Sequence, residues 1–181
     1  DMQNWHKLFN YEGDANNTLS SLWTVDYSGI KRCNDVIKYL GYAAGNLTDA
    51  NKKWYEMQAR TLRVFYYNML WHYFGNIPFY LTNMESPYKA PQLKADEVYS
   101  QLIVELESVI DSKVLPMRWD DKNCGRMSQA MCYMMYAEMV MYQNDQSRYA
   151  TALTYLQEII GSTKYQLNPK FGDIWAESGE W

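Results

Sequence analysis

The fold is decided by residues 63–81, RVFYYNMLWHYFGNIPFYL, in which Arg63 is the only charged residue when the histidine is neutral. Three interpretations fit such a run: a membrane span, an aromatic binding surface, or the core of a helical domain. A transmembrane helix needs about 20 mostly apolar residues without a break. Here Gly75 and Pro78 end the helix after about three turns of uncharged sequence, because proline cannot continue a helix. The run is therefore too short to cross a bilayer.

The composition indicates a globular chain that is rich in aromatic residues. Of its 181 residues, 48% are hydrophobic and 16% are aromatic, including 17 Tyr and 7 Trp. A chain of this length forms one domain with a sizeable core, or part of a larger protein. The net charge is −4, from 17 basic and 21 acidic residues. This balance argues against nucleic acid as a partner, because phosphate binding needs a basic patch.

Apolar residues at steps of three and four predict five helices joined by loops. Thr48 or Asp49 is the expected N-cap of the second helix, Asp96 that of the third, and Ser128 lies near the start of the fourth. The segment between the second and third helices contains three prolines and is expected to be an irregular connection. The helices are expected within residues 21–45, 46–75, 96–112, 127–144 and 147–161.

The apolar stripes predict which residues form the core. The second helix is expected to bury Ala59, Leu62, Tyr66, Met69 and Tyr73, with Phe65 and Leu70 widening that face. The third is expected to bury Val98, Leu102, Leu106, Val109 and Ile110. The fifth is expected to bury Tyr149, Ala152, Leu153, Leu156, Ile159 and Ile160, with Gly161 just beyond its end.

The connections predict an all-α fold of tetratricopeptide-like helical hairpins with irregular loops. Short turns join the first two helices and the last two, which favours antiparallel pairs. Ala130, Ala137 and Ala152 are small residues among bulky ones, as tight helix pairs require, although no regular 34-residue period is visible. We expect a polar aromatic N-terminal segment (1–20), a helical core (21–161) and an irregular tail (162–181).

The sequence offers little for catalysis or metal binding. It contains two histidines and none of the metalloprotease, nucleophile-elbow, phosphate-loop or dinucleotide motifs. Asp120 and Asp121 suggest a cation loop, but the glycine and distal glutamate of a calcium loop are missing. The three cysteines have no C-x-x-C spacing. We expect no enzyme, metal or cofactor; the paired carboxylates of a glycosidase leave no sequence signature, so that alternative stays open.

The N-terminal aromatic residues stand in a polar setting. Trp5 and Trp23 lie in or beside a segment that also contains Asp14, Asn16 and Asn17. Flat aromatic faces beside amides and carboxylates suit a sugar, whose CH groups stack on a ring while its hydroxyls form hydrogen bonds. The alternative is that the tryptophans anchor the segment on the helices. Both interpretations stay open for Trp5, whereas Trp23 fits packing better.

Five segments, in order, resemble the SusD/RagB-type family. The first is YEMQARTLRVFYYNMLWHYFGNIPFYL, residues 55–81, with Val64 and Asn76 where Ala and Asp are usual. In it the matching residues are Ala59, Leu62, Arg63, Tyr66, Tyr67, Phe74, Gly75 and Pro78. The other segments are YSGIKRCNDVI (27–37, with Asn34), DEVYSQLIVELESVI (96–110, with Glu105 for the usual Asp), GRMSQAM (125–131, with Gly125 and Arg126) and YATALTYLQEIIGSTKYQL (149–167).

The resemblance implies a non-catalytic surface protein for nutrient uptake in Bacteroidetes-type bacteria. Such proteins bind oligosaccharide or polysaccharide, or in some members peptide, and lie over a SusC-like TonB-dependent outer-membrane transporter. An alternative within the same system is a helical scaffold that binds a protein or peptide. The family consists of lipoproteins, so a signal and an acylated cysteine are expected before Asp1. Further loops of a C-terminal half are expected after Trp181.

The resemblance also implies roles for individual residues. In the family, part of the ligand surface comes from the segment before the first of these helices. That position makes Trp5, Asn16, Asn17 and Trp23 the candidate ligand-binding residues. Arg63 and Arg126 are expected to be structural, bonding helix or loop carbonyls. The identity of the sugar does not follow from the sequence.

Overall fold

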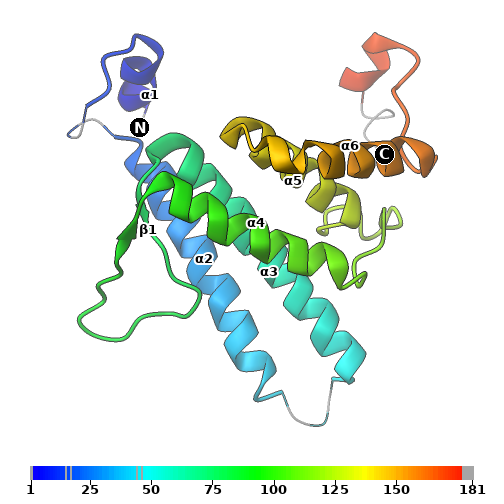
Figure 1. The fold of residues 1–181 in the computed structure, drawn as a ribbon, viewed down its shortest axis with the longest axis horizontal. Coiled ribbons are helices and arrows are strands. Elements are labelled where there is room, and N and C mark those ends of the chain that lie inside the picture. Colours follow the sequence, from blue (N-terminus) through cyan, green and yellow to red (C-terminus); the bar gives the residue numbers. More distant parts are fainter. Residues whose placement is uncertain (1, 15, 17, 44, 46, 177–181) are drawn as a thin grey trace. The chain divides into compact units, whose positions relative to one another are not determined.

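The fold is described from a computed structural model, which defines residues 2–14, 16, 18–43, 45 and 47–176, with side chains from Trp5 onward. This part of the chain contains six α-helices, two short 3-10 helices and one ladder of two two-residue strands (Figure 1). The predicted all-α class is confirmed. The chain forms two compact units, Asp1–Leu102 (unit 1) and Ile103–Trp181 (unit 2). None of the helices defined here is long and apolar enough to span a membrane.

Unit 1 is built on a long antiparallel helical hairpin. It contains α1 (Met2–Phe9), α2 (Ser20–Leu40), α3 (Asp49–Phe74), β1 (Ile77–Pro78), β2 (Gln92–Leu93) and the first half of α4 (Ala95–Asp111). As predicted, Thr48 caps α3: its hydroxyl accepts a 3.1 Å hydrogen bond from the Asn51 amide. Gly75 ends α3 at φ 67°, a conformation that favours glycine. The short helix α1 was not expected, because a helix of eight residues is marginal on its own.

The buried face of α3 is rotated from the predicted stripe. Tyr73 is 44% exposed and Phe65 is 40% exposed, and Leu62, Tyr66 and Met69 are half-buried. Residues buried to 2% exposure or less are Met57, Val64, Tyr67, Leu70 and Trp71, together with Thr61. The reason is that α3 contacts more than α2: Tyr67 packs on Phe79 and Trp71 stacks on Tyr99. These partners cover a different face of α3 from the predicted one, so the prediction is right for Ala59 and Leu70 and wrong for the rest of the stripe.

One close approach fixes the hairpin. Gly29 of α2 lies against the ring of Tyr66 in α3, and a methyl group built on Gly29 would overlap that ring. The two helices therefore meet at a distance that excludes every other side chain at this position.

The connection between α3 and α4 is more ordered than predicted. β1 and β2 pair antiparallel, with Ile77 opposite Leu93 and Pro78 opposite Gln92. The Asn76 side chain accepts a 2.9 Å hydrogen bond from the Ala95 amide at the start of α4. The helix thus begins at Ala95, and the predicted cap Asp96 lies in its first turn. All five predicted core residues of α4 are buried to 1% exposure or less.

Unit 2 contains the second half of α4, α5 (Gln129–Gln143), η1 (Gln146–Arg148), α6 (Tyr149–Gly161) and η2 (Phe171–Trp175). Ser128 caps α5 by accepting a 3.3 Å hydrogen bond from the Met131 amide. Helices α5 and α6 pack side by side, with Tyr133 stacked on Tyr155 at 4.2 Å between ring centroids. The small residues predicted for this pairing are buried, each 5% exposed: Ala130, Ala137 and Ala152.

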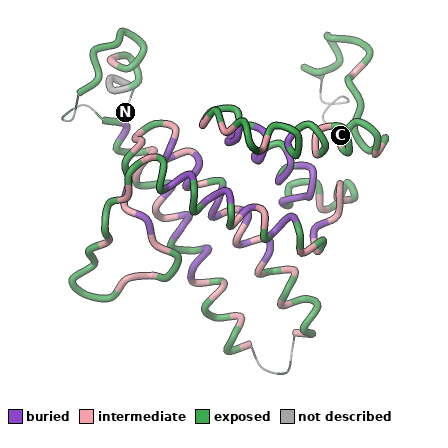
Figure 2. The backbone as a smooth tube through the Cα atoms, in the orientation of Figure 1, coloured by how far each residue is buried: buried purple, intermediate pink, exposed green. Residues whose placement is uncertain are grey.

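The predicted inward face of α6 is largely wrong. Ala152 is its one buried residue, whereas Leu153 is 56% exposed and Ile160 is 77% exposed. Most of α6 is coloured as exposed in Figure 2. Within unit 2, α6 packs mainly on α5, so one narrow stripe of its surface is covered. Gly161 was expected just beyond the end of α6, but it is the last residue of the helix and Ser162 is the C-cap.

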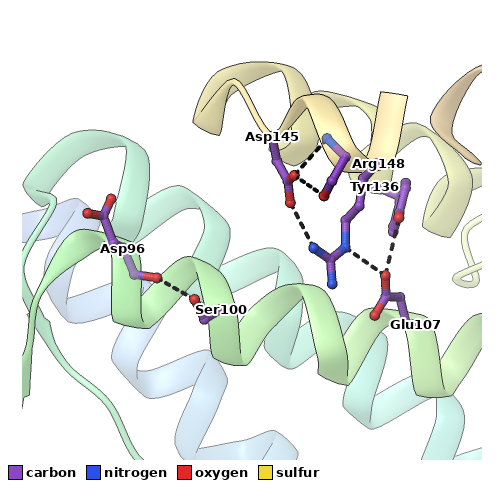
Figure 3. A network of polar contacts seen from close by, with 7 residues as sticks. Asp96, Ser100, Glu107, Tyr136, Asp145 and Arg148 are labelled. Carbon is purple, nitrogen blue, oxygen red and sulfur yellow. Dashed lines mark hydrogen bonds and ion pairs between the residues drawn. The ribbon is translucent and has the colours of Figure 1, made fainter. Parts of the chain in front are cut away.

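A polar network joins three elements of unit 2 (Figure 3). Arg148 donates a 2.9 Å hydrogen bond from Nε to Glu107 of α4 and a 2.8 Å bond from Nη1 to Asp145. The Tyr136 hydroxyl of α5 donates to the same Glu107 carboxylate at 3.2 Å. These bonds fix η1 against α4 and α5.

Candidate functional site

A cavity of about 380 Å³ lies in unit 1 between α2 and the loop that follows β1. We call it the tyrosine groove. Four of its residues lie at helical steps on one face of α2: Thr24, Tyr27, Ser28 and Lys31. Four come from the loop, about 50 residues later in the chain: Tyr80, Asn83, Met84 and Tyr88.

Three tyrosine rings give the groove its flat apolar surfaces. The rings of Tyr27 and Tyr80 are nearly parallel, with an interplanar angle of 16° and centroids 6.1 Å apart. The third tyrosine, Tyr88, is 73% exposed, and its backbone has a positive φ of 57°. Burial raises the pKa of Tyr27 and of Tyr80 above the usual value of a phenol, and for Tyr27 the neighbouring Tyr67 and Tyr80 add to this effect. Both phenols therefore stay protonated at physiological pH.

Several hydroxyl groups of the groove are available to a ligand. Within the described ranges of the chain, no hydrogen bond engages the side-chain hydroxyls of Thr24, Ser28, Tyr80 and Tyr88. The Lys31 ammonium donates a 2.6 Å bond to Asp35 and is 65% exposed. Aromatic faces next to uncommitted hydroxyls can stack on and hydrogen-bond a polyhydroxylated molecule.

Asn83 belongs to the wall of the groove. Its amide nitrogen donates to Asp35 Oδ1 at 2.6 Å and to the Lys31 carbonyl at 3.1 Å. Its oxygen accepts a 3.3 Å bond from Asn34. Both amide N–H groups are thus used within the protein, and the side chain attaches the loop to α2.

The groove is lined by hydroxyl, aromatic, amide and ammonium groups and one thioether. Its eight lining residues include no acid, histidine or cysteine. Over the residues that the structure defines, no group of three or more histidine, cysteine or acidic residues could hold a metal ion. The groove therefore supplies stacking surfaces, hydroxyls and one ammonium group.

None of the predicted ligand-binding residues that the structure describes lines the tyrosine groove. Trp5 is 41% exposed on α1, with its ring edge-on to Tyr73 at 6.0 Å. Trp23 is half-buried and packs edge-on against Phe74 at 5.0 Å. Asn16 is exposed, and its backbone amide bonds the Asp14 side chain at 2.7 Å. Asn17 lies outside the described residues.

The structure does bring two of these residues to the edge of a second cavity. This cavity has a volume of about 310 Å³ and is lined by Leu8, Gly13, Asp14, Thr18, Leu19, Tyr73 and Phe74. Trp5 and Trp23 contact Tyr73 and Phe74, respectively, from outside the lining set. Trp23 also contacts Tyr27 of the tyrosine groove, with centroids 4.7 Å apart.

The groove itself was missed by sequence reasoning. Tyr80, Asn83 and Tyr88 lie in the segment assigned to an irregular connection. The signal that could have found them is the one that singled out Trp5: aromatic residues beside an amide in a polar segment. The pairing of this loop with α2 joins residues about 50 positions apart, which no local pattern encodes.

Arg63 has the predicted structural role and bonds a loop carbonyl, whereas the bond of Arg126 goes to a side chain. Arg63 is 5% exposed and donates from Nη1 to Asn34 Oδ1 at 2.6 Å and to the Leu81 carbonyl at 3.0 Å. Arg126 donates from Nε to Asn123 Oδ1 at 2.8 Å and stays on the surface. The Asn123 amide in turn bonds Asp120 at 2.7 Å, in the loop considered for a cation.

No family model and no curated protein matches the chain. Solved structures do. Surface glycan-binding protein A from Bacteroides uniformis is 65% identical, with a TM-score of 0.95 over 100% of this chain and 40% of that one. Surface glycan-binding protein A from Bacteroides thetaiotaomicron in complex with laminarihexaose is 51% identical, with a TM-score of 0.91 over 100% of this chain and 37% of that one. A laminarin-binding SusD-like protein, 24% identical with a TM-score of 0.79, shares the fold over 89% of this chain and 35% of that one.

The chain thus spans about 40% of the length of the first of these structures. The names of all three proteins describe binding of a glycan or of laminarin.

Proposed function

Because the chain belongs to the SusD/RagB-type family, we propose that it binds glycan for a surface nutrient-uptake system and that the tyrosine groove holds the glycan. One observation carries this proposal. Two nearly parallel tyrosine rings lie in one cavity beside hydroxyl groups that no other described residue engages. That combination suits a neutral sugar better than a peptide or an anion.

We propose laminarin-type oligosaccharide as the ligand class. The relative that is 51% identical was solved with laminarihexaose, a neutral glucose oligomer. In the tyrosine groove, one glucose ring would place its CH face on the exposed ring of Tyr88, beside the stacked pair of Tyr27 and Tyr80. Sugar hydroxyls would bond the hydroxyl groups of Thr24, Ser28 and Tyr88, and the exposed Lys31 ammonium would donate to a ring or bridging oxygen.

Binding without catalysis is part of the proposal. Glycoside hydrolysis uses two carboxyl groups flanking the scissile bond, and the residues lining the groove include none. A protein of this kind would present intact oligosaccharide to a SusC-like TonB-dependent transporter from a lipid-anchored position at the outer membrane. Relatives described as surface proteins support the cell-surface location.

The residues predicted from the N-terminal segment have a place in this proposal as a second contact surface. Trp5 offers an exposed ring, and Asn16 is exposed on the same segment. Trp23 would support that surface from beneath through Phe74. Asn17 stays a prediction.

The experiment is affinity electrophoresis in gels cast with laminarin, followed by calorimetric titration with laminarihexaose. Tyr88→Ala removes an exposed ring of the groove, and Tyr42→Ala is the matched control because the two residues are 73% and 74% exposed. We expect laminarin to retard the native chain and the Tyr42 variant but not the Tyr88 variant. Trp5→Ala is the third variant, and loss of retardation in it alone would move the site to the N-terminal surface.

Unchanged migration of all four proteins in laminarin would contradict this ligand assignment. A panel of gels with other polysaccharides would then test the family function itself. Failure in every gel would favour the alternative of a scaffold that binds a protein or peptide.

A further inference from the structure

The first part of the loop wall of the tyrosine groove, residues 78–83, is bonded to the helical hairpin. The Tyr27 hydroxyl donates to the Pro78 carbonyl at 2.7 Å. Arg63 donates to the Leu81 carbonyl at 3.0 Å, and Asn83 is attached to α2 through its side chain. The first two bonds are donated by side chains of α2 and α3, and Asn83 donates from the loop to acceptors on α2, so the shape of the loop depends on residues outside it.

Tyr67 makes the central contact of this set. Its hydroxyl donates to the Tyr80 carbonyl at 2.7 Å and accepts from the Tyr80 amide at 3.0 Å. One phenol thus satisfies both backbone groups of the residue whose ring faces Tyr27 across the groove. The ring of Tyr67 is 0% exposed and packs against Phe79 at 4.5 Å between centroids.

Arg63 supports the next residue of the loop from the same helix, one turn before Tyr67. Its guanidinium joins the Leu81 carbonyl to Asn34 of α2. Neither Arg63 nor Tyr67 lines the groove. Their polar atoms are aimed at the backbone that carries the binding side chains.

We propose that Tyr67 is a positioning residue that holds the loop in its binding shape before the glycan arrives. The inference rests on the proposed function of the groove. A loop that is ordered beforehand loses no freedom on binding, so more of the contact energy appears as affinity. A loop that forms its binding shape for only a fraction of the time raises the apparent Kd by the inverse of that fraction.

Tyr67→Phe is the cleanest test, because it keeps the buried ring and removes the hydroxyl. The Tyr80 amide and carbonyl then lose their partner, and the loop is expected to open part of the time. We expect calorimetric titration with laminarihexaose to show an affinity about tenfold weaker than that of the native chain.

Tyr133→Phe is the matched control. Tyr133 is 1% exposed, and its hydroxyl donates to Glu158 at 2.7 Å in unit 2. The same chemical change is therefore made at a buried phenol outside the groove. We expect the two variants to lose similar thermal stability while only the Tyr67 variant loses affinity. Equal affinities would overturn the positioning role.

Hydrogen exchange at the Tyr80 amide gives a readout that a general loss of stability would not produce. In the native chain without glycan, we expect this amide to be protected, because the loop is already formed. In the Tyr67 variant, we expect fast exchange without glycan and restored protection with laminarihexaose. Fast exchange at Tyr80 in the free native chain would show that the glycan orders the loop, and would also overturn the inference.

Tyr80→Ala separates this inference from the proposed function. Native affinity in Tyr80→Ala means that the groove is not the glycan site, and the proposed function fails with it. Weakened binding in Tyr80→Ala together with native binding in Tyr67→Phe would leave the groove as the site and refute the positioning role alone.

Discussion

Arg63 and Asn34 lie 29 positions apart in the sequence and meet inside unit 1, where the guanidinium donates a 2.6 Å hydrogen bond to the amide oxygen. They are 5% and 3% exposed. Both residues belong to the segments that resemble the SusD/RagB-type pattern. Their contact links α2 to α3, and through the Leu81 carbonyl it extends to the loop of the groove.

Arg63→Leu should be among the most destabilising changes in unit 1. It removes the donor for one buried and one partly buried acceptor and leaves the Asn34 amide oxygen and the Leu81 carbonyl without that partner. We expect the free energy of unfolding to fall by about 2–4 kcal/mol, measured by urea denaturation. Arg126→Leu, on the surface, serves as the comparison and should change it by less than about 1 kcal/mol. Similar losses in both variants would contradict a special role for the buried arginine.

Asp26 should make the protein less stable at neutral pH than at mildly acidic pH. Burial raises the pKa of this carboxyl from 3.8 to about 6, and among the described residues Oδ2 has no hydrogen-bond partner. The folded chain therefore holds this proton more tightly than the unfolded chain does. Between about pH 4 and pH 6 this group lowers the free energy of unfolding as the pH rises.

Asp26→Asn removes the charge and should raise the free energy of unfolding at pH 7 by about 1–3 kcal/mol. The gain should disappear at about pH 4, where the native carboxyl is protonated. Denaturant titrations of both proteins at the two pH values measure the difference. A gain of equal size at both would exclude the titration of Asp26 as its cause.

Glycan binding should be independent of pH through the neutral range. The hydrogen bond from Lys31 is the largest of the effects that hold the pKa of Asp35 below its usual value of 3.8, and the bond from Asn83 adds to it. The ionised form that anchors the loop is therefore present above that value and lost only as the pH falls through the lower folded-state pKa. Titrations with laminarihexaose from about pH 5 to pH 8 should give one affinity.

Asp35→Asn tests that anchor directly. It removes the charge that accepts from Lys31 and Asn83, so we expect weaker binding at every pH. Asp49→Asn, at the start of α3 and away from the groove, is the control and should bind as the native chain does. A steep loss of native affinity between pH 8 and pH 5 would show that a group other than Asp35 titrates in this range and controls binding.

Arg148→Met should lower the stability of unit 2 modestly. The bonds to Glu107 and Asp145 raise the pKa of the guanidinium, but its side chain is 32% exposed, so solvent screens the interaction. We expect a loss of about 1 kcal/mol in a urea titration. Lys53→Met breaks a more exposed pair, with Glu56, and should cost less. The reverse order would mean that the network in Figure 3 adds nothing to stability.

Local signals predicted the starts of α3 and α5. Thr48 and Ser128 cap their helices as expected, because a cap depends on residues within one turn. The inward stripe of α4 was also predicted correctly, since one face of that helix is clearly apolar. The five segments that resemble the SusD/RagB-type family indicated a SusD-like helical fold, and the solved structures confirm it.

The buried face of α3 and the tyrosine groove depend on contacts between residues that are far apart in the sequence, so local patterns did not predict them. The buried face of α3 includes Arg63 and Asn68, polar residues that no apolar stripe would place in a core. Arg63 is buried because Asn34 and Leu81 receive its hydrogen bonds. The groove joins α2 to a loop that lies about 50 residues away, so its two halves had no common pattern.

The crossing of Gly29 and Tyr66 sets a limit on how this chain can vary. In a library of all single substitutions selected for folding, most helix positions of α2 should accept many residues. Position 29 should accept glycine alone, because even a methyl group meets the Tyr66 ring. A second library built on Tyr66→Ala should reopen the position to alanine and serine. The frequency at which variants of position 29 survive selection would then measure how much space the Tyr66 ring takes up there.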